Sequence, residues 1–326
     1  MIMPTNDQIL TIFENHLAQL TAPPEPQRLY QPLVYAMSGG GKRLRPVLLL
    51  LACNAYSDDI RPALDAATAV EVFHNFTLLH DDIMDNAMMR RGKPSVHARW
   101  GANVAILSGD AMLICAYKLL RRSPEQLLPR LLDIFNKMAA EVCEGQQYDM
   151  DFEQRRKVSV VEYMHMIELK TAVLLAGAAH IGAVIGGAPE EDCRKLCRFA
   201  TEIGLAFQLQ DDLLDSFGTE EELGKRIGGD ILEGKQTYLM VMAHSRADEP
   251  TREILRNTYK DDSLTDEQKI ERVKDVFRRL GVERMAEQQI SLRFERALGI
   301  LDSLSIPAER TEGLKEFACN LTGRKR

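Results

Sequence analysis

The sequence predicts an all-α protein with one domain over residues 1–326 and roughly ten or more helices. Apolar residues recur at helical spacing along the chain, whereas alternating, strand-like runs are nearly absent. Clusters of Gly and Pro divide the chain into segments of helical length. A length of 326 residues would allow two domains, but helical folds of this size are commonly single units with one core.

Two segments are apolar around nearly their whole circumference, Leu64–Met84 and Leu196–Leu214. Helices of this kind lie in the centre of a bundle. The stretch from Asp261 to Arg296 is instead charged and amphipathic, so we expect a solvated outer helix there. Breaks are expected at residues 23–24, 38–41, 57–59, 91–94, 124, 186–189, 218–229 and 248–250.

Composition and charge favour a soluble, globular protein that does not bind nucleic acid. The net charge of −7 would repel a phosphate backbone, and 45% hydrophobic with 27% charged residues is typical of globular chains. The six cysteines form no CxxC pair and accompany no signal peptide, which favours the reducing cytoplasm. The longest apolar stretch, Ala172–Ala188, is interrupted by His180 and glycines, so we expect a core helix and no transmembrane segment.

Both central helices end in an acidic motif of the same form. The motifs read His80-Asp81-Asp82-Ile83-Met84-Asp85 and Gln210-Asp211-Asp212-Leu213-Leu214-Asp215. Within each motif the first and last aspartates are four residues apart and share a helix face. Carboxylates at the negative end of a helix dipole require a cation, and magnesium suits them because it binds one or two carboxylates together with substrate phosphates.

One acidic motif alone is most often a solvated helix end or the cap of the next helix. Two copies, each ending a strongly apolar helix, instead favour two termini that face one polar cavity. We therefore predict a magnesium–diphosphate site at that cavity rather than a closed structural metal site.

Basic residues stand where they could bind a diphosphate. A glycine turn after Ser38 leads into Lys42 and Arg45, and its backbone amides would add to an anion site. Each single cation is more often a surface charge, but cations recur beside both motifs, as Arg90, Arg91, Lys93, Lys225 and Lys235. Another, Lys170, stands with Thr171 at the start of the apolar stretch. A nucleotide-binding P-loop is excluded, since Gln236 follows Lys235 where that loop requires Ser or Thr.

Together these residues resemble the trans-prenyltransferases of the polyprenyl synthetase family, which includes farnesyl and geranylgeranyl diphosphate synthases. The resemblance covers nearly the whole chain, and its motifs are Gly40–Pro46, Leu79–Asp85, Arg90–Gly92, Lys170–Thr171, Phe207–Asp215 and Gly224–Lys225. It implies a single helical bundle around a central active-site cavity, a homodimer, and about three magnesium ions that bridge both acidic motifs to an allylic diphosphate. Arg226 and Leu239 depart from the pattern, where many relatives have proline.

The resemblance also implies a role for each candidate residue. The principal metal ligands would be Asp81, Asp85 and Asp211, with Asp82 and Asp215 in the same site. The allylic diphosphate would contact Arg90, Lys170, Gln208, Lys225 and Lys235. The Lys170 carbonyl or the Thr171 hydroxyl would steady the allylic cation. Isopentenyl diphosphate would contact Lys42, Arg45, His74 and Arg91, with Arg324–Arg326 closing over it. Magnesium and these cations would stabilise the departing diphosphate while the isopentenyl double bond attacks the allylic cation.

Product length is expected to depend on Phe76, which lies five residues before Asp81 and thus about 7–8 Å back along the helix. The next residue, Thr77, is small, and Phe73 is a second candidate barrier. Within the family resemblance, a single aromatic residue at the Phe76 position goes with geranylgeranyl (C20) rather than farnesyl (C15) products. Ordinary core packing is the alternative explanation for both phenylalanines.

Two other functions compete with chain elongation. A class I terpene cyclase would share the helices and the metal site, but it needs no second diphosphate site, so Lys42, Arg45 and Arg91 argue against it. A non-catalytic helical partner subunit of a prenyl synthase would be expected to lack at least one acidic motif, and both are intact.

Overall fold

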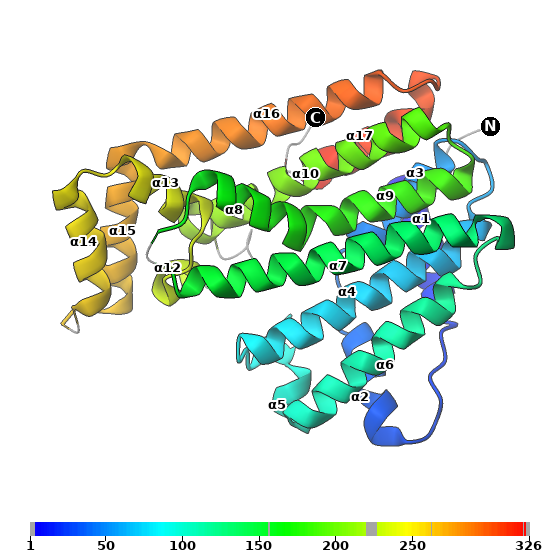
Figure 1. Ribbon diagram of the computed structural model, residues 1–326, viewed down its shortest axis with the longest axis horizontal. Helices are drawn as coiled ribbons and strands as arrows, with labels where there is room; N and C mark the ends of the chain where they lie inside the picture. Colours follow the sequence, from blue (N-terminus) through cyan, green and yellow to red (C-terminus); the bar gives the residue numbers. More distant parts are fainter. Residues whose placement is uncertain (1–3, 156, 220–226, 262, 322, 324–326) are drawn as a thin grey trace. The chain divides into compact units, whose positions relative to one another are not determined.

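The protein is all-helical apart from one short hairpin in the part of the chain that the structure describes, which confirms the predicted fold class (Figure 1). The structure is a computed structural model that describes residues 4–155, 157–219, 227–261, 263–321 and 323. Its α-helices are α1 Asn6–Leu17, α2 Gln27–Met37, α3 Leu44–Asn54, α4 Leu64–Met84, α5 Val96–Trp100, α6 Ala102–Leu120, α7 Leu128–Glu153, α8 Val160–Ile167, α9 Val173–Gly186, α10 Glu190–Phe217, α12 Gly229–Glu233, α13 Tyr238–Arg246, α14 Glu249–Lys260, α15 Asp266–Leu280, α16 Val282–Asp302 and α17 Glu312–Leu321. Short 3₁₀ segments cover Arg61–Ala63, Glu125–Leu127 and Ala308–Thr311, a π-helical turn covers Glu168–Ala172, and β1 Met89–Arg90 pairs antiparallel with β2 Lys93–Pro94.

The two apolar segments are helical, as predicted. Helix α4 has the bounds of the first segment, and α10 contains the second. Helix α10 begins earlier than the apolar pattern because acidic residues fill its first turn, where they interact favourably with the helix dipole.

The prediction of a single outer helix between Asp261 and Arg296 is wrong. The stretch divides at Gly281, which has a left-handed backbone (φ 68°) and separates α15 from α16. A left-handed glycine is a common way to end a helix, because its backbone satisfies the last carbonyls without a side-chain clash. Helix α15 begins at a Thr265 capping box and does present a charged outer face.

The chain folds into two compact units. The first unit contains Met1–Lys137, Gly177–Cys197 and Leu304–Phe317, and the second contains Met138–Ala176, Arg198–Ser303 and Ala318–Arg326. Helices α7, α9, α10 and α17 each contribute residues to both units. The expectation of one domain stays a prediction.

In the first unit, α3 and α9 approach each other backbone to backbone. A Cβ added at Gly182 would lie 2.0 Å from the carbonyl oxygen of Leu49, and one at Gly186 would lie 2.6 Å from that of Cys53. Both contacts advance by four residues on each helix, so α3 and α9 run parallel and contact each other once per turn. Helix α4 packs against α3 and, on another side, against α6.

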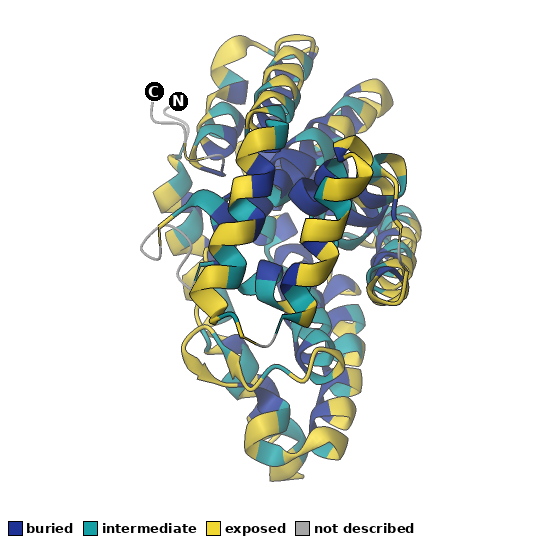
Figure 2. Cartoon of the chain, turned by 90° about the vertical axis from the view of Figure 1, so that its left-hand side faces the viewer, coloured by how far each residue is buried: buried dark blue, intermediate teal, exposed yellow. Residues whose placement is uncertain are grey.

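The second unit has its own hydrophobic core, formed by buried residues of α8, α10, α13, α15 and α16 such as Tyr163, Leu209, Val241, Phe277 and Ile290. Figure 2 shows exposed residues along the outer faces of its helices, with buried residues beneath them. Amphipathic helices of this kind place their apolar side on the core.

Two helical stretches are long and apolar enough to cross a membrane, Ala102–Leu120 and Val160–Gly186. The second is 67% buried inside the protein, as expected for a core helix, and the first is 39% buried. Core helices of soluble proteins pass the same test, so this is weak evidence for a membrane protein.

Candidate active site

The first acidic motif lies at the C-terminal end of α4, in the first unit. Asp85 caps the helix, and its amide donates to the Asp81 carbonyl over 2.9 Å. The Asp82 side chain is only 5% exposed, whereas Asp85 is exposed and Asp81 is intermediate. Burial raises the pKa of Asp82, against the opposing effect of the Arg90 guanidinium.

Arg90 joins two carboxylates of this motif. Its Nε donates to Asp82 Oδ1 over 2.8 Å, and its Nη2 lies 3.4 Å from Asp81 Oδ2. The hairpin of β1 and β2, which the sequence analysis did not predict, brings Arg90 back over the helix end through a turn with positive φ at Arg91 (52°) and Gly92 (73°). The predicted proximity of Arg90 to the motif is present in the structure.

A dense basic cluster lies in the same unit, made by Arg45, His74 and Arg91. Arg45 Nη1 is 2.9 Å from His74 Nε2, and Arg91 donates to the Gly40 carbonyl with its guanidinium against Gly41. Since arginine has only donors, His74 Nε2 must accept, and the imidazole is neutral with its proton on Nδ1. Burial, followed by the surrounding arginines, holds the pKa of His74 well below its usual value. Burial also lowers the pKa of Arg45 to about 10.

Arg43, between the two predicted ligands Lys42 and Arg45, has a structural role. It is buried with a left-handed backbone (φ 47°), and it donates to Glu14 over 2.9 Å and to Glu71 over 2.7 Å. With Arg43 in this conformation, Lys42 is exposed and α3 begins at Leu44, one residue before Arg45. Neighbouring cations therefore differ in role, because Arg43 is held in ion pairs with Glu14 and Glu71 while Lys42 is exposed.

The second acidic motif lies near the end of α10, in the second unit. Asp211 is half-buried, whereas Asp212 is 4% exposed and Asp215 is fully buried. Asp215 accepts from the amide of Asp230 over 3.1 Å. Asp212 accepts from Gln208 Nε2 over 3.2 Å, from the Tyr238 amide over 2.8 Å and from the Tyr163 hydroxyl. Burial raises the pKa of Asp212 to about 7, against these hydrogen bonds.

Lys170 and Thr171 lie on the π-helical turn Glu168–Ala172, between α8 and α9. Lys170 Nζ donates to Asp149 of α7 over 2.6 Å, and Thr171 Oγ1 donates to Gln208 Oε1 over 3.0 Å. Single π-helical turns inside α-helices are frequent at functional sites. The structure thus brings three predicted residues, Lys170, Thr171 and Gln208, into one group beside the second motif.

The π-helical turn packs directly on Gly145 of α7. A Cβ there would lie 2.3 Å from the Lys170 amide nitrogen and 2.7 Å from its Cα. Gly145 and Asp149 are four residues apart, so they share the face of α7 that supports the turn.

The remaining predicted cations differ in how well they can be placed. Lys235 Nζ is 2.8 Å from Glu233 Oε2 and 3.9 Å from Asp230 Oδ1. Lys93 is exposed on the hairpin. Lys225, Arg226 and Arg324–Arg326 lie outside the described residues.

The predicted chain-length residues form part of an aromatic row in the first unit. Phe76 is half-buried between His80 (ring centroids 4.7 Å apart) and Phe73 (5.6 Å). Phe73 is 1% exposed and packs edge-on against Phe135 of α7 at 5.3 Å. Thr77 donates to the His74 carbonyl over 2.8 Å. Phe73 is thus packed in the core, while Phe76 is only partly buried.

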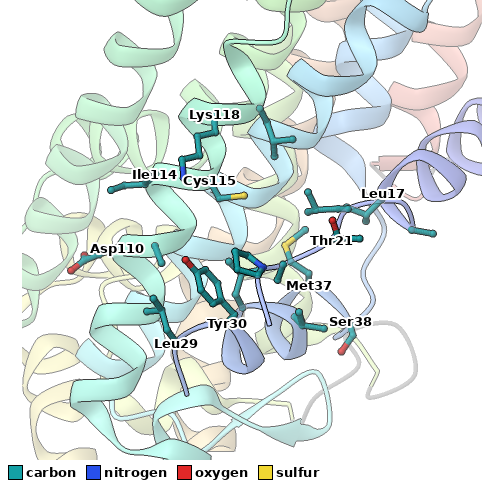
Figure 3. Close-up of a pocket in the computed structure, with 18 of the residues that line it drawn as sticks. Leu17, Thr21, Leu29, Tyr30, Met37, Ser38, Asp110, Ile114, Cys115 and Lys118 are labelled. Carbon is teal, nitrogen blue, oxygen red and sulfur yellow. The ribbon is translucent and has the colours of Figure 1, made fainter. Parts of the chain in front are cut away.

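A large cavity of the first unit, about 930 Å³, lies between α1, α2 and α6, and no aspartate of the first acidic motif lines it. Figure 3 shows Leu29 and Tyr30 of α2 beside Asp110, Ile114 and Lys118 of α6. A much smaller pocket of about 40 Å³ is lined by Asp82, Arg90 and Arg91. The small pocket, not the large one, is lined by a residue of the first acidic motif and its neighbouring arginines.

The donor set fits magnesium bound together with a diphosphate. Among the described residues, no three His, Cys, Asp or Glu side chains gather into a metal-binding group. Magnesium characteristically binds one or two carboxylates and takes its remaining ligands from water and phosphate oxygens.

The sequence analysis missed Asp149, Tyr163 and Gly145, which hold the predicted residues in place. Asp149 is 21 residues from Lys170, and Tyr163 is 49 from Asp212, so neither pairing follows from local spacing. The run Gly145-Gln146-Gln147-Tyr148-Asp149, with a small residue and a carboxylate on one helix face, was the available signal.

An all-helical fold with two aspartate-rich helix ends, one of them bound by Arg90, is typical of enzymes that bind a diphosphate together with magnesium. Residues 26–277 match the family model described as polyprenyl synthetase. The chain belongs to this family, whose members use magnesium, and it is a short-chain trans-prenyltransferase.

Relatives and solved structures agree with this assignment. The chain is 46% identical over 224 residues to a geranylgeranyl diphosphate synthase of Methanosarcina mazei, covering 68% of this chain and 69% of the relative. It is 38% identical to a short chain isoprenyl diphosphate synthase of Methanothermobacter thermautotrophicus, covering 89% and 86%. A crystal structure of a geranylgeranyl pyrophosphate synthase superimposes with a TM-score of 0.94 at 43% identity, covering 99% of this chain and 100% of the other.

Proposed function

We propose that the protein condenses isopentenyl diphosphate with an allylic diphosphate and extends it to geranylgeranyl diphosphate (C20). The observation that carries this proposal is the cluster of Arg45, His74 and Arg91, which offers an anion site apart from the predicted metal ligands Asp81 and Asp85. A terpene cyclase has no need of a second diphosphate site. The C20 length is supported by the names of the relatives and by the single aromatic residue Phe76.

In this proposal, both acidic motifs act on one allylic diphosphate, with Asp81, Asp85 and Asp211 as the principal ligands of about three magnesium ions. The bound ions would neutralise the diphosphate as it departs. Arg90 and Lys170 add positive charge at the same oxygens, while Asp82 and Asp215, which are buried and hydrogen-bonded, stay predicted ligands.

The isopentenyl double bond then attacks the allylic carbon, and the new chain loses a proton to the departed diphosphate. Lys42, Arg45 and Arg91 hold the isopentenyl diphosphate during this step. Thr171 and the Lys170 carbonyl steady the allylic cation, because the oxygen lone pairs of both groups attract positive charge.

Pure protein incubated with labelled isopentenyl and dimethylallyl diphosphates tests the proposal. We expect C20 chains with magnesium and none in a chelator. Cyclic hydrocarbons from geranylgeranyl diphosphate alone would support the cyclase instead, and no product from either mixture would support a non-catalytic subunit.

The isopentenyl site makes its own prediction. We expect Lys42→Ala and Arg45→Ala to raise KM for isopentenyl diphosphate at least about 10-fold, since each charged hydrogen bond contributes about 1.5–3 kcal/mol. KM for the allylic substrate should change less than about 3-fold. Steady-state kinetics with each substrate varied in turn measures both constants.

Arg43→Ala is the contrasting variant, because it breaks a buried ion pair and should lower stability by about 3–5 kcal/mol. Equal rises in both KM values for Arg45→Ala would show that no separate isopentenyl site exists there.

Product length makes a further prediction. We expect Phe76→Ala to lengthen the products beyond those of the wild type, because removing the ring opens space along α4 in front of Phe73. Phe73→Ala should instead cost about 3–5 kcal/mol, since Phe73 is buried against Phe135. Chromatography of the dephosphorylated products measures the product length. An unchanged length distribution for Phe76→Ala would show that Phe76 does not limit it.

We also propose that the protein acts as a homodimer in the cytoplasm. The support is an exposed apolar face on α2 and α6, where Val34 is 51% exposed, Leu107 59% and Ile114 56%. Large exposed apolar patches of this kind mark interaction surfaces. We expect light scattering to give twice the mass of the 36.8 kDa chain, and Leu107→Glu with Ile114→Glu to give the monomer. The matched surface change Val161→Glu, at a 79% exposed residue of α8, should leave the mass unchanged.

A further inference from the structure

A chain of hydrogen bonds in the second unit connects the middle carboxylate of the second acidic motif to the π-helical turn. Its members, in order, are Tyr163, Asp212, Gln208 and Thr171. The roles considered above include Gln208 and Thr171 as ligand contacts, but they give Asp212 and Tyr163 no part. The direction of these hydrogen bonds gives Asp212 and Tyr163 a role.

Asp212 sets the direction of this chain. An ionised carboxylate only accepts, so Gln208 must turn its NH2 group toward Asp212 Oδ1, 3.2 Å away. The Gln208 carbonyl oxygen then faces Thr171, and it can only accept, so the Thr171 hydroxyl must donate to it over 3.0 Å. The proton of Thr171 therefore points to Gln208, and the lone pairs of Oγ1 face the other way.

Hydrogen-bond donors of the protein hold the Asp212 carboxylate in place. Its Oδ2 accepts from the Tyr238 amide over 2.8 Å and from the Tyr163 hydroxyl, and the residue is 4% exposed. Both oxygens are thus occupied by donors from the protein. A backbone amide cannot reverse its direction, so Oδ2 stays an acceptor and Asp212 meets Gln208 through Oδ1, which accepts from the Gln208 NH2 group.

We propose that Asp212 is a positioning residue that, through Gln208, makes Thr171 present only oxygen lone pairs to the reacting allylic group. This inference rests on the proposed function, in which the allylic carbon becomes positively charged. A hydroxyl that presents lone pairs stabilises that charge, whereas one that presents its proton opposes it. Asp212 thereby acts without touching substrate or metal.

Asp212→Asn reverses the direction of these hydrogen bonds with little change in side-chain shape. The new amide keeps its oxygen on the Tyr238 amide and turns its NH2 group toward Gln208. Gln208 must then offer its carbonyl to that amide and its NH2 group to Thr171. Thr171 becomes the acceptor, and its proton turns toward the substrate. Thr171→Val removes the hydroxyl and serves as the second variant.

The kinetic test is a double-mutant cycle. We expect Asp212→Asn and Thr171→Val each to lower kcat about 100-fold, the typical effect of losing one oriented polar group. KM for the allylic substrate and the magnesium dependence should stay within about 3-fold of wild type. In the Thr171→Val background, Asp212→Asn should lower kcat by less than about 3-fold more, because both variants remove the same interaction.

Asp192→Asn is the matched control. Asp192 in the first unit is likewise buried and accepts from Tyr56 and from the backbone and side chain of Ser305, neither of which belongs to the chain that ends at Thr171. It should lose thermal stability while keeping kcat. A 100-fold fall in kcat for Asp192→Asn as well would assign both effects to lost stability and overturn the inference.

Calorimetry tests the same point without turnover. An ammonium analogue of the allylic cation, with inorganic diphosphate and magnesium, should bind about 100-fold more weakly to Asp212→Asn than to wild type. An uncharged analogue of the same shape should bind both equally. Equal losses for both analogues, a changed magnesium affinity, or additive losses in the double variant would overturn the inference. Absence of prenyl chains from wild-type protein would instead contradict the proposed function, and the calorimetric comparison would still stand.

Discussion

Asp81→Ala and Asp211→Ala should each lower kcat by roughly a thousand-fold or more. A metal ion contributes several kcal/mol of charge stabilisation in the transition state, and every 1.36 kcal/mol lost is about a tenfold change in rate. Neither change should unfold the protein, because both side chains are only partly buried. Carboxylates that repel one another without metal lower the stability of the unliganded protein, so a small rise in melting temperature is the expected direction.

Asp133→Ala is the control for these variants. Asp133 is an exposed carboxylate on α7, so its loss should leave both the rate and the melting temperature unchanged. Single-turnover rates and melting curves are the measurements. A near-normal rate in Asp81→Ala or Asp211→Ala, with the fold intact, would remove that residue from the metal site.

Gly145→Ala should cost both stability and activity, although it adds only one methyl group. The new Cβ would meet the backbone of Lys170 at 2.3 Å, and backbone atoms cannot rotate out of the way. Either α7 and the π-helical turn separate or the turn becomes regular, and both changes move Lys170 and Thr171. Overpacking of this kind costs about 1–3 kcal/mol, and a displacement of about 1 Å near the reacting groups can lower the rate about 100-fold.

Gly299→Ala provides the matched control, since Gly299 lies in α16 with no atom within 4 Å of an added Cβ. There the same change should stabilise the helix by about 0.5–1 kcal/mol and leave kcat unaltered. Denaturant unfolding and steady-state rates compare the two. Wild-type stability and activity in Gly145→Ala would contradict the argument that this glycine supports the turn.

Local pattern was enough to predict the helices that carry the chemistry. The apolar run of α4 gave its bounds, and the acidic motifs lie at or near the ends of α4 and α10, as predicted. The split at Gly281 was missed because the charged, amphipathic period continues on both sides of it, and only the left-handed backbone of Gly281 interrupts the helix.

Tertiary contacts explain what the sequence did not predict about the site. The π-helical turn depends on the space that Gly145 leaves on another helix, and the pairing of Lys170 with Asp149 depends on the same packing. The structural role of Arg43 is similar: its sequence position beside Lys42 and Arg45 suggests a ligand, while its partners Glu14 and Glu71 come from α1 and α4.

The parallel contact of α3 with α9 affects how genetic data on this protein should be interpreted. Leu49 and Cys53 rest on Gly182 and Gly186, and Arg45 lies one turn before Leu49 on the same helix. A larger residue at either glycine would push α3 along or away from α9 and carry Arg45 with it. In a mutational scan scored by growth, both glycines would therefore be as intolerant as substrate contacts. Scoring abundance beside growth would separate them, because a packing defect lowers the amount of protein and the loss of a ligand does not.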